Sequence, residues 1–158
     1  MAKPYRKNAG MIVFNAAGKV LAGDRIEYPG HFQLPQGGID EGEEPRAAAL
    51  RELYEEVGLK LEAPVGEIPA WLNYEFPEDI PKKLKKYRGQ TQKWFYFFWN
   101  GLPEDLDLDV HEREFRSVCW MDLDQLARNI IPFKKEVYAE IRRHALPFIS
   151  GYLKKIGP

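Results

Sequence analysis

The sequence predicts an α/β sandwich with a mixed β-sheet. Three observations lead to this prediction: strand-like apolar runs alternate with helical segments, one segment carries clear helix start and stop signals, and no Gly-, Ser- or Pro-rich linker divides the 158 residues. A chain of this length can bury most of its surface without disulfide cross-links. We therefore expect a single domain that spans residues 1–158.

The predicted strands are short apolar or aromatic runs bounded by turn residues. The sequence Asn-Ala-Ala-Gly at residues 15–18 joins the first two strands as a hairpin. The aromatic run at residues 94–99 suits a fully buried central strand, because neither of its faces offers polar side chains to solvent. The predicted strands span residues 10–14, 19–22, 32–34, 66–74, 94–99 and 115–121.

The clearest helix signal begins at Pro45, which suits the first turn because its missing N–H costs nothing there. Residues 47–50 are strong helix formers, and Gly58 falls where a left-handed C-terminal cap is expected. Three apolar residues in this helix, spaced at i, i+3 and i+7, predict a buried stripe. They are Leu50, Leu53 and Val57.

Two further helices are predicted towards the C-terminus. Asp122 is typical of an N-cap, and the short helix that it starts runs through Arg128. Residues 135–144 begin a C-terminal helix, which we expect to extend around Pro147 towards Lys154.

Three glutamates share a second face of the helix that begins at Pro45. Glu52, Glu55 and Glu56 stand at i, i+3 and i+4, so their side chains lie close together. Like charges so placed cost about 0.2–0.5 kcal/mol per pair in an isolated helix. The face could be an ordinary solvated acidic surface. A hard divalent cation would instead make it favourable, because Mg²⁺ prefers carboxylate oxygens and keeps waters for substrate phosphates.

The glutamates belong to a longer pattern, G-x5-E-x7-R-E-L-x-E-E-x-G-L, which resembles the Nudix box. Every defined position is filled, and so many residues in register favour the metal-binding reading over a solvated helix face. They are Gly37, Glu43, Arg51, Glu52, Leu53, Glu55, Glu56, Gly58 and Leu59.

Four other segments extend the resemblance over nearly the whole chain, at residues 5–10, 32–39, 89–95 and 133–138. Together with the box they resemble one branch of the Nudix superfamily, the bacterial RNA pyrophosphohydrolases and plant-type diadenosine polyphosphate hydrolases. The resemblance implies the Nudix fold, an α/β/α sandwich around a mixed sheet, in agreement with the strand and helix pattern.

The resemblance also implies a metal site. Glu52, Glu55 and Glu56 are expected to bind two or three Mg²⁺ or Mn²⁺ ions with help from the backbone carbonyl of Gly37. Glu43 and Arg51 are expected to orient the helix and the loop before it, and Arg51 counts among the residues needed for catalysis. Such supporting groups raise the precision of metal ligands.

Glu114 matches a glutamate that this branch supplies from outside the box as a metal ligand or general base. It could also be an exposed carboxylate of the acidic stretch at residues 105–114. The implied reaction is hydrolysis of a phosphoanhydride, in which metal ions neutralise phosphate charge and activate a water. A nearby carboxylate can accept the proton of that water. None of the scattered histidines, His31, His111 and His144, is expected to be catalytic.

The residues expected to hold the substrate come from several parts of the chain. Arg25, Phe133 and Lys134 match positions that grip a base in this branch, and a ring stacked on such groups gains roughly 1–3 kcal/mol. Gln36, in the turn before the box, is also expected to contact substrate. Tyr74 could add a second stacking platform or simply pack in the core.

Three features bear on the choice of substrate. Asp24 stands beside Arg25 where the bacterial enzymes often carry two basic residues, which would weaken the positive field for a long RNA. Residues 67–77 look closer to the dinucleoside polyphosphate hydrolases. Lysines and an arginine at residues 82–88 form a basic run that is either a solvated loop or a contact for an RNA backbone, whose binding would depend on salt.

The composition is that of a soluble globular protein, and the formal net charge of −1 gives no overall attraction to nucleic acid. The single cysteine, Cys119, lies in an apolar run and is expected to be a buried structural thiol. We find no signal-peptide core and no run of the ~20 apolar residues that a membrane helix needs. We therefore expect a cytoplasmic protein without membrane or stable protein partners; the sequence leaves its oligomeric state open.

The sequence thus predicts a metal-dependent hydrolase that acts on the 5′-triphosphate end of RNA or converts diadenosine tetraphosphate to ATP and AMP. One alternative is a Nudix triphosphatase that removes damaged nucleotides from the nucleotide pool. A second is a non-catalytic Nudix module that binds a nucleotide or RNA.

Overall fold

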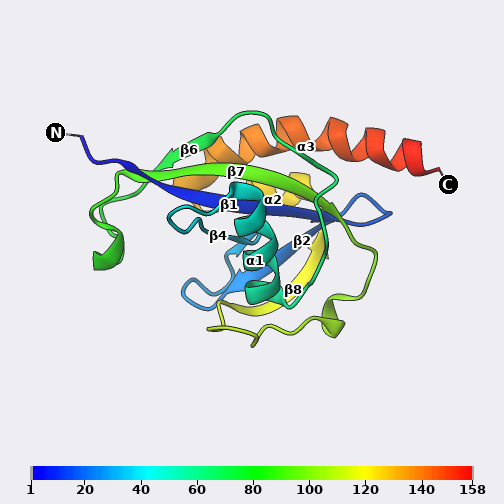
Figure 1. Cartoon of the computed structure of the whole chain (residues 1–158), viewed down its shortest axis with the longest axis horizontal. Helices are drawn as coiled ribbons and strands as arrows, with labels where there is room; N and C mark the ends of the chain where they lie inside the picture. The colour runs from blue at the N-terminus through cyan, green and yellow to red at the C-terminus, as the bar shows by residue number, and fades with distance from the viewer. Residues whose placement is uncertain (1, 158) are drawn as a thin grey trace.

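The computed structural model describes residues 2–157, in which a mixed eight-stranded sheet lies between helices on its two faces (Figure 1). The strands are β1 (Tyr5–Phe14), β2 (Val20–Arg25), β3 (Phe32–Gln33), β4 (Gln36–Gly38), β5 (Gly66–Glu67), β6 (Leu72–Glu75), β7 (Gly89–Phe98) and β8 (Phe115–Met121). The helices are α1 (Pro45–Val57), α2 (Leu123–Asn129) and α3 (Lys135–Ile156), with short 3₁₀ turns at Lys82–Leu84, Pro103–Asp105 and Pro132–Lys134.

The sheet is built around the parallel pair β1 and β7. These strands pair from Tyr5 opposite Gly89 to Phe14 opposite Phe98. The hairpin predicted at residues 15–18 sets β2 antiparallel to β1, and β8 then pairs with β2. β4 pairs with the middle of β1, while β5 and β6 both pair with β7. A parallel pair of this kind is normally buried on both faces, as it is here.

The sheet separates two apolar clusters. One face packs against α2 and α3 around Ile12, Trp94 and Tyr138. The other packs against α1 around Leu53 and Phe97. The predicted α/β/α sandwich is therefore confirmed, and the chain folds with α1 alone on the face that carries the box glutamates.

The helix signals read from the sequence are confirmed. Pro45 occupies the first turn of α1, and Gly58 ends the helix at a φ of 72° while its N–H donates to the carbonyl of Tyr54. Asp122 caps α2 by accepting a hydrogen bond from the N–H of Asp124 at 3.1 Å. α3 continues through Pro147 to Ile156. In the predicted apolar stripe of α1, Leu53 and Val57 are fully buried and Leu50 is half-buried.

The prediction of one strand over residues 66–74 is wrong. Two short strands, β5 and β6, occupy this region, and residues 68–71 leave the sheet between them. Pro69 accounts for the break, because it has no N–H to donate to a neighbouring strand. The aromatic strand is longer than predicted, since β7 already begins at Gly89. Its polar first half matters for the site described below.

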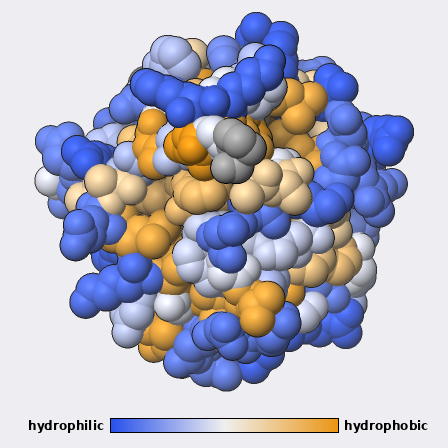
Figure 2. All heavy atoms as spheres, turned by 90° about the vertical axis from the view of Figure 1, so that its right-hand side faces the viewer, coloured by the Kyte–Doolittle hydropathy of each residue, from blue (hydrophilic) through white to orange (hydrophobic). Residues whose placement is uncertain are grey.

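The C-terminal half of α3 packs on the domain. The Phe148 ring stacks on Tyr96 of β7 with 3.9 Å between ring centroids. A Cβ atom on Gly66 would lie 2.5 Å from the Phe148 ring, so this close approach needs glycine in β5. Figure 2 shows the end of the molecule that lies on the right in Figure 1, where polar side chains surround separate apolar patches. Among the described residues, no helix is both long and apolar enough to cross a membrane.

Candidate active site

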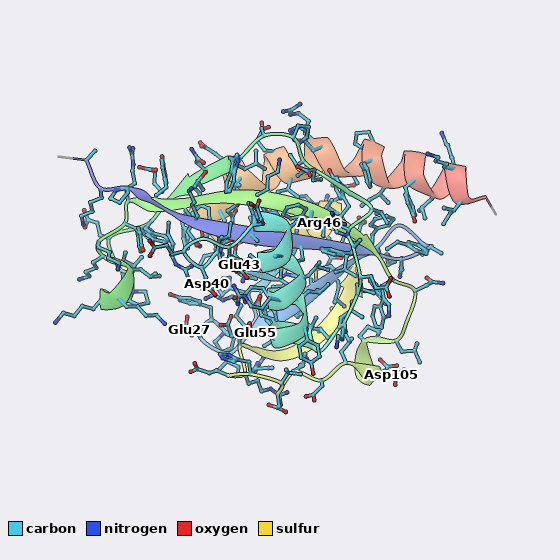
Figure 3. All side chains as sticks on the ribbon, in the orientation of Figure 1. Glu27, Asp40, Glu43, Arg46, Glu55 and Asp105 are labelled. Atoms are coloured by element: carbon cyan, nitrogen blue, oxygen red, sulfur yellow. The ribbon has the colours of Figure 1, made fainter. Side chains whose placement is uncertain are left out.

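The acidic groups of the box gather along one side of α1. Figure 3 labels Asp40 and Glu43, from the loop before the helix, and Glu55 from within it, all on the same side of α1. Asp40 and Glu43 lie on one loop. This loop bends at Gly42, whose φ of +78° favours glycine. The local sequence thus brings loop carboxylates next to helix carboxylates.

Arg51 holds these carboxylates together. Its guanidinium donates two hydrogen bonds to Glu43, each 2.9 Å long, and one each to Glu52 and Glu55 at 2.8 Å. It also donates to the carbonyl of Gly38 at 2.9 Å, which ties α1 to strand β4. The hydrogen bonds from Arg51 keep the pKa of Glu43 below its usual value. The predicted orienting role of Arg51 and Glu43 agrees with these contacts.

Glu56 is the most unusual carboxylate of the site. The residue is only 4% exposed, and neither of its carboxylate oxygens has a hydrogen-bond partner among the described residues. Burial raises its pKa well above the usual value, and the nearby charges of Glu114 and Glu52 raise it further. A buried carboxylate without a partner is costly, so a bound cation would compensate it.

Gly37 lies against Glu52. A Cβ atom at Gly37 would lie 2.0 Å from the carboxyl carbon of Glu52, a distance at which the two cannot coexist. Strand β4 places Gly37 there by pairing with β1, with Gly37 opposite Ala9. Only glycine lets the β4 backbone approach the helix carboxylate so closely. This approach fits the expected contribution of a backbone carbonyl from this turn to a metal site.

The donor set fits a hard divalent cation, but its oxygens are not arranged as a finished cage. Within residues 2–157, no three His, Cys, Asp or Glu side chains are placed so that they could hold a metal ion as they stand. The contacts of Arg51 explain this, because its Nη1 occupies one oxygen of Glu52 and one of Glu55. A cation at this site would use the other oxygen of Glu52 and of Glu55, so that Arg51 could keep these contacts.

Glu114 comes close to the box glutamates although it lies far from them in sequence. Burial raises the pKa of both Glu52 and Glu56, and the charge of Glu114 raises both further. Its backbone carbonyl accepts a hydrogen bond from the N–H of Ile26 at 3.0 Å, which fixes the chain just before β8. The residue is exposed, so its side chain can reach solvent as well as the buried Glu56.

The residues expected to hold the substrate meet beside β4. Lys134 is 3% exposed; its Nζ donates to Gln33 at 2.8 Å and lies 5.4 Å from the centre of the Tyr74 ring. Burial, with a smaller contribution from the charge of Arg25, lowers the pKa of Lys134 to about 7. The Tyr74 ring lies 5.8 Å from that of Phe133. Because Tyr74 is only 6% exposed, its position favours core packing over an open stacking platform.

Arg25 is already engaged in this structure. Its guanidinium lies 4.7 Å from the centre of the Tyr28 ring and pairs with Glu27 at 3.1 Å. Phe133 is half-buried and packs against the apolar core. A base held between Arg25 and Phe133 would require Arg25 to leave Tyr28.

Asp24 has a charged partner that the sequence did not reveal. Asp24 is 5% exposed and accepts hydrogen bonds from the N–H of Gly30 at 2.8 Å and from Nε of Arg116 at 3.2 Å. The hydrogen bond from Arg116 is the main cause of its lowered pKa. Arg116 therefore compensates the charge of Asp24 within the fold.

The basic run lies in the exposed connection between β6 and β7. Within residues 2–157, Arg88 pairs with Glu75 at 2.9 Å, and the lysines of the run form no ion pair. Cys119 is half-buried, and burial raises the pKa of its thiol. The basic run thus keeps its lysine charges available, whereas Cys119 is less buried than the sequence predicted.

Sequence reasoning missed several polar residues that border the site. They are buried or half-buried amides and one arginine on β1, β3 and β7. The signal available in the sequence was the alternation of glutamines with other residues at the start of β7, in a strand that is otherwise apolar. These residues are Arg6, Asn8, Gln33, Gln90 and Gln92.

Comparison with known proteins places these features in a wider context. A protein-family model described as NUDIX domain matches residues 4–141. The chain is 42% identical over 153 residues to the RNA pyrophosphohydrolase of Azorhizobium caulinodans, which covers 89% of this chain and 91% of that protein. It is 40% identical over 145 residues to Nudix hydrolase 26, chloroplastic, of Arabidopsis thaliana, with coverage of 87% of this chain and 67% of that protein. The MutT protein from Methanosarcina mazei Go1 has the same fold, with a TM-score of 0.69 at 18% identity over 92% of this chain and 99% of that chain.

Proposed function

The chain belongs to the Nudix family of hydrolases, and from this premise we propose that it cleaves a phosphoanhydride bond in nucleoside polyphosphates, with the 5′-triphosphate end of RNA as its main substrate. The relative from Azorhizobium caulinodans, named as an RNA pyrophosphohydrolase, is similar over almost the full length of both chains, which supports this choice.

One observation carries the proposal, the buried carboxylate of Glu56. In a protein without a bound cation, an unpartnered carboxylate at 4% exposure costs free energy that neither packing nor hydrogen bonding returns. The charges of Glu52 and Glu114 next to it increase that cost. A carboxylate group so placed is explained by a function that brings a cation to it.

Nudix hydrolases use divalent metal ions, and we propose Mg²⁺ or Mn²⁺ here, two or three ions with substrate bound. The ligands would be the carboxylates of Glu52, Glu55, Glu56 and Glu114 with the carbonyl of Gly37. Such ions neutralise the charge on the non-bridging phosphate oxygens and make a water more acidic.

The protein's own residues then position the reaction. Arg51 supports Glu52 and Glu55 by charge-assisted hydrogen bonds, which restrict the directions in which these carboxylates can turn. Glu114 is exposed yet close to Glu56, so it is the best-placed carboxylate to accept the proton of an attacking water from solvent.

The substrate base is proposed to lie against Phe133, with Arg25 turned from Tyr28 onto its other face. Lys134 and Gln36 would contact the substrate beside it, and the Nζ of Lys134 lies 5.4 Å from the centre of the buried Tyr74 ring. The lysines at residues 82–86 lie on an exposed loop, form no ion pair with any residue in the described range 2–157, and could contact the phosphates of a longer RNA. Diadenosine tetraphosphate is the second candidate, supported by the sequence similarity of residues 67–77 to the dinucleoside polyphosphate hydrolases.

The test is a comparison of rates at equal concentration and saturating Mg²⁺. We expect hydrolysis of 5′-triphosphorylated RNA, with a 5′-monophosphate product, to exceed that of diadenosine tetraphosphate. We also expect the KM for RNA to rise with salt, and Lys82→Gln combined with Lys83→Gln to reduce that dependence. Faster conversion of the dinucleotide to ATP and AMP would make it the substrate.

Two other outcomes would point to the remaining alternatives. Selective hydrolysis of a damaged nucleoside triphosphate over both RNA and the dinucleotide would indicate a role in cleansing the nucleotide pool. Absence of Mg²⁺-stimulated phosphate release from the whole panel would indicate a module that only binds nucleotides or RNA.

A further inference from the structure

Two glutamines of β7 are buried in the centre of the sheet. Gln90 is 5% exposed and Gln92 is 1% exposed. Because side chains alternate along a strand, both point to the face that also carries Trp94 and Tyr96. Buried amides in an apolar strand are costly unless their donors and acceptors are paired. The partners of these two amides therefore show what the glutamines do.

Gln92 connects β7 to the β4 turn. Its Nε2 donates to Oδ1 of Asn8 at 3.0 Å and to Oε1 of Gln36, and its Oε1 accepts from Nε1 of Trp94 at 3.3 Å. Gln36 lies in β4, on the far side of β1 from Gln92. Gly10, the β1 residue opposite Gln36, has no side chain, and the Trp94 ring fills this space, because a Cβ atom there would lie 2.2 Å from the ring.

Gln90 has a different set of partners two residues earlier on the same strand. Its Nε2 donates to the hydroxyl of Tyr74 at 2.5 Å, and its Oε1 accepts from Nη1 of Arg6 at 3.0 Å. The other end of that guanidinium lies against β4, since a Cβ atom on Gly38 would be 2.2 Å from its Nη2. Gln90 is neutral, so its hydrogen bond orients Arg6 without compensating the positive charge.

On the basis of the proposed function, we propose that Gln92 and Gln90 are positioning residues with different targets. Gln92 holds Gln36 and thereby the short strand β4. The second residue of β4, Gly37, approaches Glu52, so Gln92 positions the metal site. Gln90 holds the guanidinium of Arg6 beside the same turn; its target is the anionic substrate. Neither glutamine touches the reacting atoms.

Strand β4 needs the contact from Gln92 because it is short. Its backbone pairs with β1 over three residues only, and all three are half-buried. The hydrogen bond from the side-chain amide of Gln92 to Gln36 fixes this strand from the inside of the sheet. Without it, Gly37 could shift relative to Glu52, and metal affinity depends on such supporting contacts by roughly 10–100-fold.

The physical reason for the second half is the charge of Arg6. A carboxylate at position 90 would pair with the guanidinium and reduce its attraction for phosphate, whereas glutamine fixes its direction only. Tyr74 keeps the Gln90 amide from turning by occupying its donor side. The loss of Gln90 would therefore change substrate affinity and leave the metal ligands in place.

The test compares Gln92→Met with Gln90→Met, two changes of similar volume on one strand. The affinity for Mn²⁺ without substrate, measured by electron paramagnetic resonance, monitors the metal site. The KM for 5′-triphosphorylated RNA monitors the substrate site. We expect Gln92→Met to weaken Mn²⁺ binding about 10-fold or more. We expect Gln90→Met to leave Mn²⁺ binding unchanged and to raise KM about 10-fold, the loss of one charge-assisted hydrogen bond.

A second variant keeps the test informative if Gln92→Met folds poorly. Gln36→Met removes the other end of the same hydrogen bond from a half-buried strand, and it should reproduce the loss of Mn²⁺ affinity. The double variant Gln36→Met with Gln92→Met should then lose little more Mn²⁺ affinity than either single variant, because the two residues act through one contact.

The proposal is overturned if Gln92→Met and Gln90→Met both change Mn²⁺ affinity, or both change only KM. It is also overturned if these two variants lower only the melting temperature. Failure of the proposed function looks different. In that case the unchanged protein itself would neither bind Mn²⁺ nor hydrolyse the RNA, whereas the positioning proposal alone fails when the unchanged protein does both and the variants match it.

Discussion

The burial of Glu56 makes a specific prediction about stability and pH. Its pKa in the folded protein lies well above the value near 4.5 expected in the unfolded chain. Between these two pKa values the folded state binds the extra proton. The free energy of unfolding of the metal-free protein should therefore fall as pH rises, by up to about 1.4 kcal/mol per pH unit from this one group.

The substitution Glu56→Gln removes that dependence. A neutral amide has no proton to lose, so the variant should be less sensitive to pH than the unchanged protein between pH 5 and 8. The control is Glu62→Gln, at an exposed residue that forms no ion pair within the described chain. It should keep the slope of the unchanged protein.

The assay is urea unfolding in excess EDTA at several pH values, monitored by tryptophan fluorescence. Without EDTA, Mg²⁺ at 100 times its dissociation constant for the unchanged protein should add about 2.7 kcal/mol to that protein's free energy of unfolding. Binding should release protons. The same Mg²⁺ concentration should stabilise Glu56→Gln less. Equal pH slopes for the two proteins would refute the reasoning, because Glu56 would then carry no penalty for its charge.

Three further predictions follow from named contacts. Gly37→Ala should abolish most Mn²⁺ binding and turnover, since the new Cβ would lie 2.0 Å from the Glu52 carboxyl carbon; normal binding measured by titration would contradict the close approach. Arg51→Lys should lower kcat by roughly 10–100-fold because lysine cannot bridge several carboxylates, while Arg46→Lys, at an exposed residue of the same helix, should have no effect on steady-state rates. Phe148→Ala should lower the free energy of unfolding by about 2–4 kcal/mol by removing its stacking on β7, with kcat per folded molecule unchanged.

Local signals made the helix that carries the box glutamates predictable. Pro45 and Gly58 determine where α1 begins and ends, and each acts through backbone geometry within its own turn. The spacing of Glu52, Glu55 and Glu56 then follows from the helical repeat alone. For these residues the sequence contained the physical cause of the structure.

Contacts between distant segments were less accessible. The strand break at Pro69 is local, but it required knowing that both flanking segments pair with β7. The compensation of Asp24 by Arg116 depends on the pairing of β2 with β8, which no sequence spacing reveals. The residue whose role was left open, Tyr74, proved to be buried because β6 presents alternate side chains to the core.

The most direct test of the account is the dependence of turnover on Mg²⁺ for the unchanged protein and for Glu56→Gln, with 5′-triphosphorylated RNA as substrate. The account predicts saturable Mg²⁺ activation of the unchanged protein and loss of nearly all turnover in a folded Glu56→Gln at every Mg²⁺ concentration. A near-normal kcat of Glu56→Gln at saturating Mg²⁺ would contradict the assignment of the metal site.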